Sequence, residues 1–129
     1  MSRTAVRVLA VGAAAAAALA GWCVVGPLAG VELTVDGANG RTVTVGAGIV
    51  VVLSLVAGLA GWALLALLER TTRRARGLWT AIAVVVLILS FAPLADGTIG
   101  TGTRVGLGSL HLVVAAVLIP AMRRTARRR

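Results

Sequence analysis

The chain has 129 residues, of which 59% are hydrophobic and only 13% are charged, and its mean hydropathy is +1.00. Soluble domains carry about a quarter charged residues, so this composition excludes an ordinary soluble domain. The few charges lie at the ends of long uncharged runs, as in integral membrane proteins. We therefore expect a single membrane domain over residues 1–129.

The formal net charge of +9 arises because 13 basic residues, all of them Arg, oppose only 4 acidic residues. Nucleic-acid binding needs a basic face on a soluble scaffold, whereas these arginines flank apolar stretches. The expected partner is therefore the lipid bilayer and not a nucleic acid. The one cysteine, Cys23, excludes an intrachain disulfide and is too little for a cysteine-based metal site.

Four uncharged stretches are long enough to cross a bilayer, and they occupy residues 8–31, 42–68, 77–95 and 105–122. Even the shortest covers about 27 Å as a helix, close to the ~30 Å hydrocarbon core. A backbone in lipid must satisfy its own hydrogen bonds, and these runs do not alternate as barrel strands do. The sequence predicts an all-α membrane protein, a bundle of four transmembrane helices at about 8–29, 46–68, 78–95 and 105–122.

The first of these stretches also has features of a cleaved signal peptide. Two arginines precede the apolar run, and Ala18-Leu19-Ala20 resembles a cleavage site. The apolar run continues to residue 31, however, which is longer than a signal peptide needs. We expect a retained span.

The arginine distribution predicts the orientation. All 13 except Arg41 and Arg104 lie in the N-terminal tail, the loop 69–77 or the tail 123–129. The positive-inside rule places these segments, and both termini, in the cytoplasm of a multi-pass protein of the cell membrane. Trp62 and Trp79 lie toward the inner boundary, where interfacial anchors occur.

The arginines of the loop and the tail are also candidate contacts for anionic lipid head groups, each worth about 1 kcal/mol near the surface. These candidates are Arg70, Arg73, Arg74, Arg76, Arg123, Arg124, Arg127, Arg128 and Arg129. The simpler interpretation is orientation and anchoring. Glu69 and Arg73 stand four residues apart, a spacing that favours a helical ion pair extending the second helix past the membrane face.

The segment 31–45 alone shows the two-residue period of strands. Apolar and polar residues alternate before and after a Gly-rich centre, and Asp36-Gly37 and Asn39-Gly40 offer residues suited to positive φ in a tight turn. The sequence predicts a short extracellular β-hairpin between the first two helices, with an apolar face resting on the helix ends because an isolated hairpin is marginal. An irregular polar loop is the alternative.

His111 is the one ionisable residue well inside a span, and such residues are the first functional candidates because they are costly to bury in lipid. Counting the helical rise places Ser90, Ser54 and Cys23 at a similar depth. This polar layer could form a cavity in which His111 relays a proton or binds a ligand. Alternatively, a neutral His111 hydrogen-bonds Ser90 and links two helices.

The sequence shows no catalytic set. No carboxylate pair lies within the spans, and one histidine with one cysteine is too little for a zinc or haem site. We expect neither enzymatic activity nor a cofactor nor a metal.

Small residues recur at helical spacing and favour close helix contact. Ser54 with Gly58 marks the second helix, whereas Gly12, Ala16 and Ala20 mark the first. These stripes suit packing within the bundle, a homo-oligomer or an unidentified membrane partner, and the pattern leaves the choice open.

Three parts of the chain carry a family resemblance: the second-helix run 59–70 that ends in Glu69-Arg70, the Trp79-Thr80 start of the third helix, and the fourth helix with His111. They resemble a family of small four-helix membrane proteins of unknown function from GC-rich actinobacteria. The resemblance implies the same fold and topology and no activity.

Small multidrug exporters also have four helices, but they resemble this chain less. Their coupling needs a carboxylate in the first helix, and residues 8–29 contain none. The sequence therefore favours a structural or interaction component of the cytoplasmic membrane. The alternative is a small transporter or sensor that uses the polar layer around His111.

Overall fold

The computed structural model describes residues 1–37, 39–95 and 97–126. Its four long helices are α1 (Arg3–Cys23), which continues into the π-helical turn η1 (Val24–Leu28), α2 (Ala47–Thr71), α3 (Ala75–Ser90) and α4 (Thr101–Thr125). Two short strands, β1 (Thr34–Asp36) and β2 (Thr42–Thr44), join the first two helices, and a 3-10 turn, η2 (Pro93–Ala95), follows α3.

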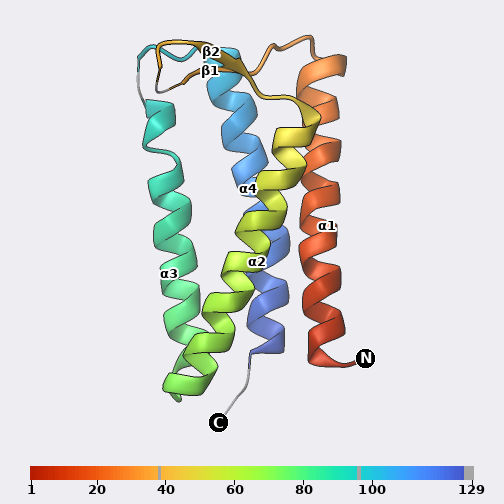
Figure 1. Cartoon of the computed structure of the whole chain (residues 1–129), viewed down its shortest axis with the longest axis vertical. Helices are drawn as coiled ribbons and strands as arrows, with labels where there is room; N and C mark the ends of the chain where they lie inside the picture. The colour runs from red at the N-terminus through yellow and green to blue at the C-terminus, as the bar shows by residue number, and fades with distance from the viewer. Residues whose placement is uncertain (38, 96, 127–129) are drawn as a thin grey trace.

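The helices lie side by side as a bundle (Figure 1). The start of α1, the end of α4 and the α2–α3 turn lie at one end, here called the terminal end, and the strands lie at the other, here called the hairpin end. Four helices are long and apolar enough to cross a membrane. These features confirm the predicted four-helix architecture and the small antiparallel sheet between the first two helices.

The helices extend further than the uncharged stretches do. Helix α1 begins at Arg3 because the hydroxyl of Ser2 caps it, accepting a hydrogen bond from the backbone N–H of Ala5 at 3.1 Å. Helix α4 runs on to Thr125. The first helix was expected to begin at about residue 8 and the fourth to end at about residue 122, because charged residues flank those positions. In the structure, capping and backbone hydrogen bonding determine where the helices begin and end. Arg7 therefore lies inside α1 and not in a tail.

The strands pair in antiparallel register, with Val35 opposite Val43. Gly40 takes the left-handed conformation that the turn was expected to need, with φ +67°. Gly37 does not, so the expectation for Asp36-Gly37 was wrong. A Cβ at Gly37 would instead lie 3.0 Å from the carbonyl oxygen of Arg41, a distance that favours glycine by close approach. Residue 38 of the predicted hairpin lies outside the described residues.

Residues flanking the strands hold the hairpin on the helices. Leu33 is 2% exposed and packs over Gly106 of α4, where a Cβ would lie 2.7 Å from the Leu33 side chain. The hydroxyl of Thr103 donates to the carbonyl of Glu32 at 3.1 Å, and Trp22 Nε1 donates to the carbonyl of Val45 at 2.8 Å. The hairpin thus rests on both α1 and α4.

Close packing joins α1 to α2. A Cβ at Gly58 would lie 2.9 Å from Val11 of α1, so the small-residue stripe on α2 is used within the bundle. The stripe on α1 is not: Gly12, Ala16 and Ala20 are all exposed.

A buried ion pair connects three helices at the terminal end. The guanidinium of Arg7 on α1 contacts both carboxylate oxygens of Glu69 on α2, at 2.7 and 3.2 Å. It also donates from Nε to the hydroxyl of Thr125 on α4 and from a terminal nitrogen to its carbonyl, both at 3.1 Å. The Arg7 and Glu69 side chains are only 8% and 10% exposed. We call these three residues the clasp.

The clasp replaces the ion pair expected from the sequence. Helix α2 ends at Thr71, so Arg73 lies beyond it and is not on the helical face of Glu69. The carboxylate of Glu69 turns inward to Arg7 because the guanidinium is buried and needs a counter-charge.

We predict that Glu69→Gln destabilises the bundle by about 3 kcal/mol, because it leaves the buried Arg7 charge without that carboxylate. Replacing both Arg7 and Glu69 by Met should cost less than the single change, since no unpaired charge is then buried. Thermal unfolding in detergent micelles, followed by circular dichroism, measures both. Arg70→Gln, at an exposed position, is the control and should have little effect. A double variant that loses as much stability as Glu69→Gln, or more, would contradict the clasp.

A matched pair of glycine variants tests the packing of α1 on α2. Gly58→Ala should lower stability by about 1–3 kcal/mol because the new methyl overlaps the β-branched side chain of Val11. Gly12→Ala meets nothing within 4 Å and should not destabilise. The same unfolding measurement applies, and equal effects at the two sites would contradict this packing.

Candidate functional site

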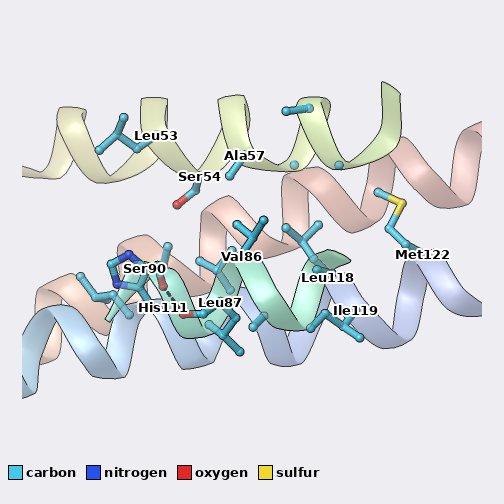
Figure 2. A pocket seen from close by; sticks show the side chains of 18 of the residues that line it. Leu53, Ser54, Ala57, Val86, Leu87, Ser90, His111, Leu118, Ile119 and Met122 are labelled. Atoms are coloured by element: carbon cyan, nitrogen blue, oxygen red, sulfur yellow. Dashed lines mark hydrogen bonds between the residues drawn. The ribbon is translucent and has the colours of Figure 1, made fainter. Parts of the chain in front are cut away.

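A cleft of about 510 Å³ lies between α2, α3 and α4 (Figure 2). On α2 its lining runs from Val50 to Leu64, and on α4 from Leu107 to Met122. These spans correspond to about 20 Å along each helix at a rise of 1.5 Å per residue. The cleft is therefore long and follows the membrane normal expected for the bundle.

Helix α3 buries its own residues only near the terminal end, and at the hairpin end the segment after it contacts α4 through Phe91 and Leu94. The buried residues of α3 are Ala75 and Trp79, both near the terminal end, where Trp79 Nε1 donates to the carbonyl of Gly61 at 2.7 Å. From there α2 and α3 diverge toward the hairpin end (Figure 1). Trp79, expected as an interfacial anchor, is instead 4% exposed and joins α2 to α3.

The divergence opens the cleft sideways. Leu53 of α2 and Val86 of α3 both line it, yet they are 61% and 59% exposed. In a bilayer this opening faces lipid chains, so a membrane molecule can reach the cleft without crossing water.

Three of the four residues predicted as a polar layer line this cleft. Ser54, Ser90 and His111 come from α2, α3 and α4 and lie toward its hairpin end, whereas Met122 lies at the opposite end (Figure 2). Cys23 is exposed and is not part of the lining. Counting the helical rise cannot show which side of a helix faces the bundle, and α1 turns Cys23 outward.

The hydrogen bond expected between His111 and Ser90 is not formed. The hydroxyl of Ser90 donates to the carbonyl of Leu87 at 2.6 Å, and His111 Nδ1 lies 2.7 Å from the carbonyl oxygen of Leu107. Each side chain thus bonds to its own helix. The ring of His111 also lies 6.0 Å from that of Phe91, which holds it from the α3 side.

Ser54 differs from the other serines of the chain. Ser2 caps α1, and Ser90 and Ser109 bond back to carbonyls of their own helices. Ser54 is 6% exposed, and its hydroxyl has no hydrogen-bond partner among the described residues. Its oxygen points into the cleft (Figure 2). The hydroxyl is therefore open to a molecule bound in the cleft.

The described arginines proposed as lipid contacts lie near the terminal end. Arg76 is half-buried; the exposed ones are Arg70, Arg73, Arg74, Arg123 and Arg124. Arg127, Arg128 and Arg129 lie outside the described residues. The exposed guanidinium groups are free to approach head groups.

Sequence reasoning missed the clasp. Arg7 was counted as a topology signal and Glu69 was paired within its own helix. The available signal was an acidic residue directly after the long apolar run 42–68, where a carboxylate needs a partner. That signal does not reveal which of 13 basic residues is the partner.

Comparison with known proteins gives a family but no activity. No curated protein and no solved structure matches the chain. A family model described as a family of unknown function, DUF6069, matches residues 1–128. The chain, a four-helix protein with a sideways-open cleft, therefore belongs to the DUF6069 family.

Proposed function

We propose that this chain is a non-enzymatic interaction component of the cytoplasmic membrane that takes an amphiphilic molecule from the bilayer into the cleft. The cleft itself carries the proposal: it is about 510 Å³ in volume, open toward lipid, and polar at one end. Pockets for small ligands occupy roughly 300–1,000 Å³ and are mostly apolar with a few placed polar groups. The cleft has the same character.

A purely structural role explains the cleft less well. Helix bundles gain stability by close packing, and space left between helices forfeits those contacts. Here α1 packs closely on both α2 and α4, while α3 leaves its hairpin-end half, including Val86 and Leu89, exposed. An occupant from the bilayer would supply the missing contacts.

Transport by a proton relay through His111 is the second candidate, and the lining of the cleft argues against it. Beyond the polar layer, the described lining toward the terminal end consists of apolar residues such as Ala57, Leu118 and Met122. A relay needs further titratable groups along its path. Binding, with or without sensing, fits this lining better.

The orientation belongs to the same proposal. The arginine-rich segments lie together at the terminal end, which supports a cytoplasmic location for both termini and the α2–α3 turn. The hairpin and the polar end of the cleft then lie on the outer side. The arginines of the terminal end contact anionic head groups of the inner leaflet.

We predict that a membrane-impermeant thiol reagent labels Asn39→Cys in intact cells, and labels Thr4→Cys and Thr71→Cys only after permeabilisation. All three positions are exposed, and each variant is made with Cys23→Ala so that one thiol is present. Labelling of Thr4→Cys or Thr71→Cys in intact cells would reverse the orientation.

We predict that Ala57→Phe reduces uptake of an apolar chain into the cleft by about tenfold. The added ring occupies space that the chain needs, and overpacking of this kind costs about 1–3 kcal/mol. The probe is a diazirine-bearing hexadecyl methyl ether in nanodiscs, with crosslinked peptides identified by mass spectrometry. Ala63→Phe, on the same helix but outside the cleft lining, is the control and should label like the wild type. Undiminished labelling of Ala57→Phe, or no labelling of cleft peptides at all, would contradict the proposed function.

A further inference from the structure

We propose that the cleft selects an uncharged lipid with a free hydroxyl, such as a long-chain or isoprenoid alcohol, which hydrogen-bonds Ser54 and Nε2 of His111. This inference rests on the proposed function and names the chemistry of the molecule bound there. It follows from the hydrogen-bonding capacity that the two side chains leave unused.

The hydroxyl of Ser54 supplies the first half of the recognition. A serine in a helix ordinarily bonds back to a carbonyl one turn earlier, as Ser109 does to Val105 at 2.7 Å. Ser54 has no such bond among the described residues although it is 6% exposed. Its oxygen keeps some accessible surface, and that surface faces the cleft (Figure 2). A polar group on the ligand can therefore reach this oxygen and supply the missing hydrogen bond.

His111 supplies the second half. A carbonyl oxygen can only accept, so the short contact between Nδ1 and Leu107 requires the hydrogen to be on Nδ1. In the neutral ring Nε2 then carries a lone pair and accepts. The neutral form is the one suited to hydrocarbon depth, where a charged side chain is expensive. The ligand must therefore donate a hydrogen to Nε2.

An alcohol meets both conditions. Its O–H donates to Nε2, and its oxygen accepts from the hydroxyl of Ser54. Ethers and esters only accept, so they leave Nε2 unused. The described lining residues of the cleft include no charged side chain, so an ionised carboxylate, phosphate or ammonium head would be buried without a counter-ion.

The shape of the cleft places the rest of the molecule. From His111 to Met122 the lining of α4 runs eleven residues toward the terminal end, which is about 16 Å of helix. That stretch is apolar on all three helices and suits one hydrocarbon chain. The hydroxyl then lies toward the hairpin end and the chain extends along α3 toward Trp79.

The test compares two probes on the same purified protein in nanodiscs: a diazirine-bearing hexadecanol and its methyl ether. We expect the alcohol to label cleft peptides at about tenfold lower concentration than the ether, as one or two hydrogen bonds imply. Ser54→Ala and His111→Phe should each remove most of this difference without abolishing labelling by the ether. Ser54→Thr, which keeps a hydroxyl, and Ser109→Ala, outside the cleft, should retain it.

The outcomes distinguish the hydroxyl-selective site from the cleft as a general binding site. Equal labelling by alcohol and ether in the wild type, or an undiminished difference in both Ser54→Ala and His111→Phe, overturns the hydroxyl-selective site while leaving the cleft as a binding site. Failure of both probes to label the cleft overturns the proposed function itself. Thermal unfolding of each variant shows whether it is folded. Ser54→Ala removes one oxygen only, so the comparison survives if His111→Phe is unstable.

Discussion

The buried pairing of Arg7 with Glu69 is the constraint on which the rest of the structure depends. Two charges lie in a mostly apolar bundle, and this is tolerable only when each faces the other and the remaining donors are satisfied. Thr125 completes the set with its hydroxyl and carbonyl. Because the three residues come from α1, α2 and α4, their pairing sets how these helices meet at the terminal end.

Helix α3 contributes no residue to the clasp, and its divergence from α2 leaves the space of the cleft. It is held near the terminal end by Trp79, whose indole bonds to the backbone of α2. Beyond that point it presents apolar side chains outward, and the space between it and α2 widens (Figure 1). Helix α1 thus packs closely on α2 and α4, whereas α3 has only two buried residues. The clasp lies at one end of the bundle and the polar layer of the cleft at the other, so the site and the clasp do not compete for partners.

The position of a residue along its helix could be predicted by counting residues, and this count placed Ser54, Ser90 and His111 at one level. The side of each helix that faces the bundle could not be predicted, because nearly every position on these helices is apolar and no polar face marks the outer side. Cys23 shares the depth but points away from the cleft. Likewise, the free hydroxyl of Ser54 and the bonded Nδ1 of His111 depend on local geometry that a residue pattern does not encode.

The sequence by itself determined the features that depend on local composition. Long uncharged runs specify the four described helices that are long and apolar enough to cross a membrane, and two-residue alternation specifies the small sheet between the first two. Only the tertiary structure decided the pairing of Glu69 with Arg7 in place of Arg73, the burial of Trp79, and the gathering of three polar residues around one cleft. The physical reason is the separation in sequence of the residues involved. Hydropathy and strand period are properties of residues close together in the chain, whereas ion pairs and packing contacts form between residues that the fold brings together from distant segments.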